Sequence, residues 1–175
     1  MSQAISSMTP NNTAKIDKFL ERMAGEGAHQ NELLGAGASQ TDSVWVAVGL
    51  PRRGEELFKE LQDGFEFDSV NKLIAYSFES AREFAHVVDI AEATLNRRKK
   101  QGRLNVDESD KVYRLCRVVD SATELFSGNK DKANDWMRKP ARGLGERKPI
   151  DMLKTAAEYE SVLDYIGRIR HGVFS

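Results

Sequence analysis

The sequence predicts an all-α fold on three observations. Apolar residues recur at helical spacing along most of the chain after residue 43, most clearly at Val112, Leu115, Cys116 and Val119. Candidate capping residues precede several of these stretches, and Gly or Pro follows them. Apolar residues make up 40% of the 175 residues and charged residues 30%, which is typical of a globular domain. The chain is long enough for one substantial domain or for two small domains that share a core.

Residues 1–43 are predicted to form a flexible leader. Ser, Thr, Asn and Gln dominate residues 1–12, and residues 25–42 are rich in Gly, Ala, Ser and Gln. Between these parts, Ile16, Phe19, Leu20 and Met23 give a short helix one apolar face. The glycines of residues 35–39 lack the third glycine and the preceding strand of a dinucleotide-binding loop, so we expect no such loop.

Residues 44–67 are predicted to form an N-terminal helical region that can supply a dimer interface. Residues 44–48, VWVAV, are either a strand or a buried helix, because periodicity does not distinguish the two in so short a run. Residues 55–62 are expected to form a helix with Leu57, Phe58 and Leu61 on its inner face. Gly64 ends this helix.

Residues 68–120 are predicted to contain a helix-turn-helix unit. Asp68 or Ser69 is expected to cap one helix and Ser80 the next. A further helix begins near Ala91 after a short turn, which is the spacing of this motif. Asp89 stands at the turn position, where the motif most often has Gly. Asp tolerates a left-handed backbone conformation better than most residues, so the motif is retained.

The basic residues of this unit are concentrated in one segment. Over the whole chain 26 Lys and Arg balance 27 Asp and Glu, so net charge argues neither for nor against nucleic acid. Residues 94–103, however, hold five positive charges and no negative one, which is typical of a helix that contacts a DNA groove and its phosphates. The predicted DNA-binding residues are Asn96, Arg97 and Arg98 at the groove, Lys99, Lys100 and Arg103 near phosphates, and Glu92 and Thr94 at the helix start. The alternative is a solvated basic helix in an ordinary bundle.

Residues 121–175 are predicted to form a small helical C-terminal domain. A long helix over residues 107–126 begins with acidic residues, which suit the positive end of its dipole, and joins the two halves of the chain. A shorter helix over residues 130–138 carries Ala133, Trp136 and Met137 on one face and stops before Pro140. Pro149 fits the first position of a final pair of helices.

The chain lacks the residue groupings of common catalytic and metal sites. The single Cys116 excludes an intramolecular disulfide and a cysteine-cluster metal site, and its apolar neighbours predict a buried thiol. His29, His86 and His171 are too scattered for a metal site or a catalytic triad. No apolar run approaches the roughly 20 residues that span a bilayer, and the N-terminal residues do not match a signal peptide. We therefore expect a cytoplasmic protein with no membrane segment, enzyme activity, metal or cofactor.

Six short blocks, in order from residue 94 to the end, carry a family resemblance. They are TLNRRKKQGRL, ESDKVYRL, ATELFSGN, AxxWMRKP, LGERKPIDMLKT and RIRHGVFS. Together they resemble the Xre/MbcA/ParS antitoxins, which are paired with RES-domain toxins in type II toxin-antitoxin systems. Glu146 and Glu158 depart from the family pattern, which usually has Gly at both positions. The resemblance implies an Xre-like DNA-binding part and a C-terminal part that silences a toxin that consumes NAD+ or ADP-ribosylates a target.

The resemblance also implies a toxin-binding surface at the end of the chain. The residues expected there are Trp136, Leu144, Arg168, Arg170, His171, Gly172, Val173, Phe174 and Ser175. Two arginines, an aromatic ring and a carboxylate suit a nucleotide-binding cleft, so we expect the tail to cover the toxin's NAD+ site.

For operator DNA we expect a homodimer that reads an inverted repeat with half-sites roughly 34 Å apart. The alternative is a stand-alone dimeric transcription regulator whose C-terminal module binds another protein.

Overall fold

The protein, seen in a computed structural model that describes residues 43–172, is built from helices in this part of the chain. In chain order they are α2 (Val44–Val48), α3 (Glu55–Asp63), α4 (Phe67–Ser77), α5 (Ala81–Val87), α6 (Glu92–Gln101), α7 (Val106–Leu125), α8 (Lys130–Met137), the 3-10 turns η2 (Arg142–Leu144) and η3 (Pro149–Asp151), and α9 (Ala156–His171). The all-α prediction is confirmed. The predicted leader with its short helix lies outside the described residues.

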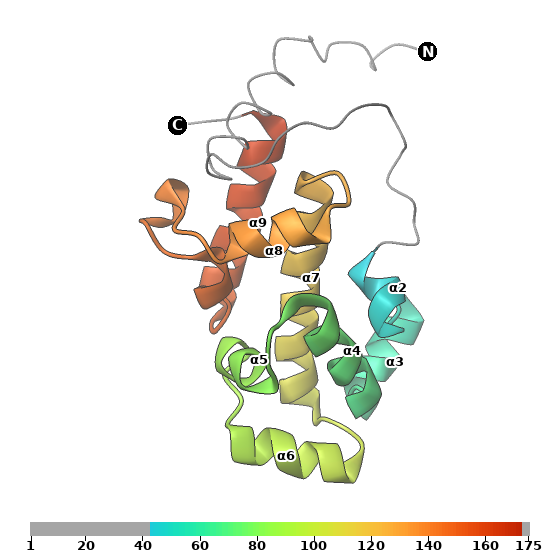
Figure 1. The fold of residues 1–175 in the computed structure, drawn as a ribbon. Coiled ribbons are helices and arrows are strands. Elements are labelled where there is room, and N and C mark those ends of the chain that lie inside the picture. The colour runs from blue at the N-terminus through green and yellow to red at the C-terminus, as the bar shows by residue number, and fades with distance from the viewer. Residues whose placement is uncertain (1–42, 173–175) are drawn as a thin grey trace, which may run out of the picture.

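Helix α7 is the element around which the others pack (Figure 1). Asn105 and Glu108 form a capping box at its start, in which each side chain bonds to the backbone N–H of the other residue. Along its length Val112, Leu115 and Cys116 are buried, as their spacing predicts. Helices α8 and α9 contact α7 near its C-terminal half, and α2, α3 and α4 also pack against it. One hydrophobic core therefore runs through both halves of the chain.

The apolar run at residues 44–48 is a helix. Ser43 Oγ accepts a hydrogen bond from the backbone N–H of Trp45, and Gly49 ends the helix with a φ of 73°. In α3 the predicted inner face is partly wrong, because Phe58 is 61% exposed while Leu57 is buried. The two residues lie about 100° apart around the helix, and this short helix buries only the narrow side that carries Leu57.

Helix α4 begins differently from the prediction of a cap at Asp68 or Ser69. It starts at Phe67, with no side-chain cap. Its first N–H group is satisfied by tertiary structure, since Phe67 N donates to Gly102 O at 2.8 Å. Close by, Leu104 N donates to Phe65 O at 3.0 Å. The loop before α4 is thereby paired with the loop after α6, which fixes where α6 ends.

The C-terminal part contains one helix fewer than the predicted final pair. The segment at Pro149 is only a 3-10 turn, because Thr155 already caps α9 six residues later. Thr155 and Glu158 form a capping box, and Glu158 Oε1 also accepts from Arg147 Nη2 at 2.6 Å. Glu158 thus has a capping function at a position where the family pattern usually has Gly.

Arg138 joins the C-terminal part to the N-terminal helices. Its Nη2 donates to the Ser77 carbonyl oxygen at 2.6 Å, and its Nε donates to Glu83 Oε1 at 3.0 Å. The guanidinium carbon lies 5.9 Å from the centre of the Phe78 ring. These contacts hold the end of α8 against the loop between α4 and α5. No helix within residues 43–172 is both long enough and apolar enough to cross a membrane.

Candidate nucleic-acid and protein interfaces

Helices α5 and α6 form the predicted helix-turn-helix. Ser80 Oγ accepts from the backbone N–H of Glu83 at 3.1 Å, so the predicted cap of α5 is confirmed. Asp89 in the turn has a φ of 51°, which is the left-handed conformation expected of it. The turn is held by Ile90 N, which donates to Ala85 O at 2.9 Å, and by Lys111 Nζ, which donates to Asp89 O at 2.8 Å.

Helix α6 lies at one end of the molecule and buries only Leu95 (Figure 1). The side chains of Glu92, Asn96, Arg97, Lys99 and Lys100 are exposed, and that of Thr94 is half-buried. Three of these residues are cations that project from one short helix. This surface has the charge and the shape to enter a DNA groove.

Two of the predicted DNA-binding arginines are bonded to other parts of the protein. Arg98 Nε donates to Glu108 Oε2 at 2.7 Å, and its side chain is only 19% exposed. Arg103 Nη1 donates to the Gly64 carbonyl oxygen at 3.0 Å, and its Nη2 lies 3.2 Å from Glu66 Oε1. These bonds tie the two arginines to the start of α7 and to the loop before α4, so both help to fix the orientation of α6 and the loop that follows it. Their contacts with DNA stay a prediction.

Glu108 is a positioning residue that the DNA-binding prediction did not include. Its Oε2 accepts from both Arg98 Nε at 2.7 Å and Asn105 N at 2.9 Å, so one carboxylate joins the C-terminal end of α6 to the start of α7. The residue is buried. The Asn-x-x-Glu spacing of a capping box is readable in the sequence, whereas the contact with Arg98 is not.

Two predicted toxin-contact residues belong to the core. Trp136 is 4% exposed, and its ring lies 6.2 Å from the rings of Phe126 and Tyr165. Leu144 is also buried. A direct contact of Trp136 with a partner is therefore corrected to a packing role: its large ring fills the space between α7 and α9 and stabilises the surface from within.

The last turn of α9 carries the remaining described candidates. Arg168, Arg170 and His171 are exposed, and Gly172 ends the helix with a φ of 68°. Arg170 Nη2 donates to Glu124 Oε2 at 2.7 Å, whereas the Arg168 guanidinium lies over the Tyr165 ring at 5.8 Å. Val173, Phe174 and Ser175 lie outside the described residues. The structure thus brings Arg168, Arg170 and His171 together at the end of α9, away from α6 (Figure 1).

Glu124 connects this end of α9 with the N-terminal helices. Its second oxygen accepts from Arg52 Nη2 at 2.7 Å, and Arg52 also contacts the buried Asp120 at 2.9 Å. Partial burial by itself would raise the pKa of Glu124, but the hydrogen bonds and charges of Arg170 and Arg52 together lower it. The position of Arg170 is therefore linked through α7 to the segment after α2.

Glu146→Gly is expected to stabilise the protein by about 0.5 to 1 kcal/mol, because only Gly adopts a left-handed conformation without strain. Glu146 has a φ of 62°, directly after Gly145 at 66°. Its exposed ion pair with Arg142, at 3.9 Å, contributes little. Thermal unfolding measures the effect. Glu146→Gln is the control, since it removes the charge and keeps the strain; equal stability of the two variants would show that strain at this residue is negligible.

The described residues do not assemble a metal site. No group of three or more His, Cys, Asp or Glu within residues 43–172 is arranged to hold a metal ion. Cys116 is fully buried, and burial together with the negative charge of Asp120 raises the pKa of its thiol. A thiol in this environment is a packing group and not a nucleophile.

Comparison with known proteins assigns both ends of the molecule to one family. A model of the Antitoxin Xre-like helix-turn-helix domain matches residues 57–117, and a model of the Antitoxin Xre/MbcA/ParS C-terminal toxin-binding domain matches residues 121–172. An Antitoxin Xre of Yersinia enterocolitica is 37% identical over 140 residues, which cover 79% of this chain and 95% of that protein.

Two further relatives agree with this assignment. An Antitoxin Xre of Photorhabdus laumondii is 36% identical over 138 residues, 78% of this chain and 93% of that protein. The Mycobacterial cidal antitoxin MbcA of Mycobacterium tuberculosis is 38% identical over 72 residues, 41% of this chain and 58% of that protein. With a helix-turn-helix at one end and a toxin-binding domain at the other, this chain belongs to the Xre/MbcA/ParS family of antitoxins.

Proposed function

We propose that the protein neutralises a RES-domain toxin, one that consumes NAD+ or ADP-ribosylates a target, by covering its active site, and that it represses its own operon by binding the promoter. The observation that carries the proposal is the placement of two exposed cationic surfaces at opposite ends of the fold (Figure 1). One is α6 and the other is the last turn of α9. This separation lets one molecule contact DNA and toxin at the same time.

On the DNA side, the exposed face of α6 supplies the contacts. Asn96 and Arg97 have the donor groups that read base edges, and Lys99 and Lys100 neutralise phosphates. Replacing either Lys by Ala lowers affinity for all sequences alike and reduces the salt dependence by about one ion. Arg98 and Arg103 act through the orientation of α6, as their bonds to Glu108 and Gly64 indicate.

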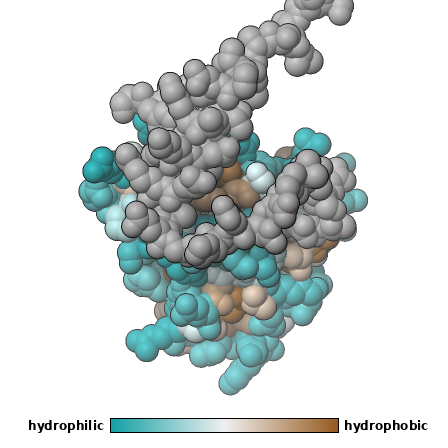
Figure 2. Space-filling model, turned by 45° about the horizontal axis from the view of Figure 1, so that its top comes forward, coloured by the Kyte–Doolittle hydropathy of each residue, from teal (hydrophilic) through white to brown (hydrophobic). Residues whose placement is uncertain are grey.

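The DNA-binding form is a homodimer in this proposal, because one short recognition helix contacts too little DNA for tight regulation. Hydrophilic residues cover most of the coloured surface in Figure 2, with smaller apolar patches between them. Val46 on α2 and Phe58 on α3 are each 61% exposed, so both large apolar side chains are accessible to a second copy of the chain. They lie in the region expected to supply the dimer interface.

Phe58→Glu is expected to convert the dimer to a monomer without unfolding it, since the side chain is exposed and a charge in an apolar interface is costly. Sedimentation measures the mass, and circular dichroism confirms the fold. Lys59→Glu on the same helix is the control for added negative charge. A wild-type chain that is monomeric at micromolar concentration, both alone and with its toxin, would contradict the proposed dimer.

On the toxin side, the end of α9 presents Arg168, Arg170 and His171 directly before the tail. Arginine pairs with carboxylates and stacks on aromatic walls, and both kinds of group line nucleotide-binding clefts. The Gly172 cap frees the chain to leave the helix at this point. The buried Trp136 and Leu144 pack beside α9 and stabilise this helix, Trp136 through its ring contact with Tyr165.

Co-expression with the product of the neighbouring reading frame tests the proposal. We expect that product to arrest growth and to deplete cellular NAD+ or ADP-ribosylate a target when expressed alone, and we expect the full chain to restore growth and to copurify with it. The alternative of a stand-alone dimeric transcription regulator predicts promoter binding with no neutralisation and no copurifying toxin. Promoter binding is measured by mobility shift with the DNA upstream of the gene.

A further inference from the structure

We propose that the cavity between η2 and α9 receives an apolar side chain of the partner toxin, seated over Gly167, and that Arg168 binds a carboxylate of the toxin beside it. This proposal rests on the proposed function, because the occupant is the toxin. It adds a second contact to the insertion of the tail. The tail would cover the toxin's active site, and the cavity would hold the body of the toxin against α9.

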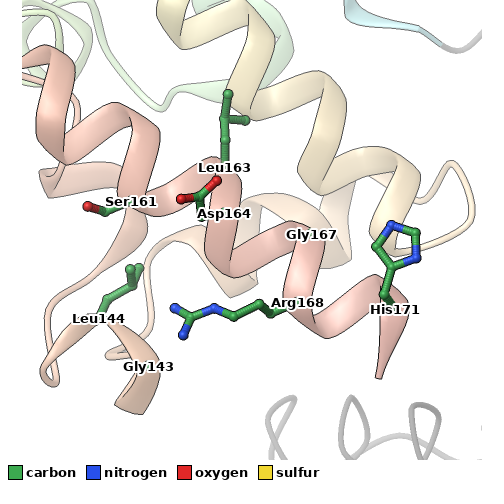
Figure 3. Close-up of a pocket in the computed structure, with 8 residues that line it drawn as sticks. All are labelled: Gly143, Leu144, Ser161, Leu163, Asp164, Gly167, Arg168 and His171. Atoms are coloured by element: carbon green, nitrogen blue, oxygen red, sulfur yellow. The ribbon is translucent and has the colours of Figure 1, made fainter. Parts of the chain in front are cut away.

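The cavity has a volume of about 690 Å³ and lies in the C-terminal toxin-binding domain. Gly143 and Leu144 of η2 line one wall, and Leu163, Asp164, Gly167 and Arg168 line the other. Figure 3 shows the Arg168 side chain extending toward Leu144, with His171 at the far end of the helix. The volume is sufficient for one large apolar side chain and the backbone that carries it.

The 3-10 turn η2, which forms one wall of the cavity, packs tightly against α9. A Cβ atom on Gly143 would collide with the ring of Tyr165, so a residue with a side chain cannot replace this glycine without a shift. Burial raises the pKa of the Tyr165 phenol, while a hydrogen bond with the Gly143 backbone lowers it in part. The cavity is therefore bounded by a well-packed element, which favours a preformed binding site.

Gly167 is the observation that points to an external occupant. A glycine inside a helix is destabilising relative to Ala, and one use of its small size is to let another backbone or a ligand approach the helix closely. A Cβ atom built on Gly167 meets nothing within 4 Å, so no group of the described chain requires its small size. A side chain here would project into open space at the cavity wall. Gly167 therefore leaves room at the cavity wall for a side chain of a partner to approach the helix backbone.

Arg168 provides the charged contact. Within residues 43–172 its guanidinium makes no ion pair, and it lies 5.8 Å from the centre of the Tyr165 ring. Stacking on a ring leaves the N–H groups at the edge of the guanidinium available for a carboxylate. Its neighbour Arg170 is already paired with Glu124 at 2.7 Å. Of these two arginines, only Arg168 has no carboxylate partner among the described residues, so its charge can pair with a carboxylate of the toxin.

The toxin is favoured as the occupant by the position of the cavity. The cavity lies wholly within residues 121–172, which match a toxin-binding domain. It also extends along α9 to His171, one residue before the tail that is proposed to enter the toxin's active site. A toxin that accepts the tail must lie against this end of α9, whereas the exposed apolar residues proposed for the dimer, Val46 and Phe58, lie on α2 and α3.

The test compares Gly167→Leu with Gly167→Ala and Ala157→Leu in the full chain. Leu at 167 should fill the cavity and weaken binding of the co-expressed neighbouring product at least tenfold by calorimetry, whereas Ala should have a smaller effect. Both substitutions should raise the melting temperature, because they remove a helical glycine. Ala157 is exposed on the first turn of α9 and does not line the cavity, so Ala157→Leu should leave binding unchanged.

The outcomes separate this inference from the proposed function. If the wild-type chain binds the product and Gly167→Leu binds it equally well, the cavity inference is wrong and the proposed function stands. A wild-type chain that does not bind the product overturns both. If Gly167→Leu does not fold, Gly167→Gln provides the same steric test with a better solvated side chain, and wild-type affinity in that variant would also overturn the inference.

Discussion

Removal of Val173, Phe174 and Ser175 is expected to abolish neutralisation of the toxin while the fold and promoter binding remain intact. The truncation keeps Gly172, whose N–H caps α9 through the carbonyl oxygens of Arg168 and Ile169, so the helix retains its end. What is lost is the apolar and charged tail that we propose to lie in the toxin's NAD+ site. The measurement is growth and NAD+ content of cells that express both proteins.

A second variant separates the chemistry of the tail from its length. Replacing the three residues with Ser-Gly-Ser keeps the chain length and removes the aromatic ring, so this variant should fail in the same way as the truncation. Glu79→Gln, an exposed residue outside the matched toxin-binding domain, serves as the unaffected control. Full neutralisation by the truncated chain would exclude direct occlusion by the tail and would place inhibition in the body of the C-terminal domain.

Arg97→Ala is expected to weaken promoter binding, whereas Arg98→Ala is expected to destabilise the fold, although the two residues are adjacent. Arg97 is exposed, so its loss should cost about 1 to 3 kcal/mol of promoter affinity and leave unfolding unchanged. Arg98 is paired at 2.7 Å with the buried Glu108. Its loss leaves that carboxylate without its cationic partner and should lower the free energy of unfolding by about 1.5 to 3 kcal/mol. Mobility shift and urea unfolding measure the two quantities.

Glu108→Gln completes this comparison. It keeps the size of the side chain and its capping contact with Asn105 while it weakens the bond with Arg98. We expect reduced preference for the promoter over unrelated DNA, because the orientation of α6 is less fixed, with toxin neutralisation unchanged. If Arg97→Ala bound the promoter as tightly as the wild type, α6 would not be the reading helix.

The two ends of the molecule are joined through one hydrophobic core and along helix α7. Helix α7 carries Glu108 beneath α6 and Glu124 beside α9, so its two ends contact both proposed interfaces. Glu124 holds Arg170 and Arg52 at 2.7 Å each. Glu124 therefore contacts both the end of α9 and the segment after α2.

Local patterns were enough to predict most of the helices. The stripe in α7 marks a buried face directly, because 3.6 residues per turn bring its apolar residues to one side. Ser80 and Asp89 were predicted because caps and left-handed turns depend on the residue itself. The sequence left strand and helix open at residues 44–48, because the five residues of α2 have too few turns to show a period. The predicted start of α4 was wrong, because Phe67 N donates to Gly102 O of a loop that is distant along the chain.

By itself the sequence determined the all-helical fold, the helix-turn-helix with its basic helix, and the family, because these depend on periodicity, turn chemistry and short blocks of residues. The tertiary structure alone decided which charged and aromatic side chains are free. Arg97 and Arg98 are equivalent as sequence, yet only Arg98 lies within reach of Glu108. Trp136 matches a family block, yet its ring is inside the core. The ion pairs and the burial of a side chain depend on residues that are distant along the chain, so a local sequence pattern does not predict them.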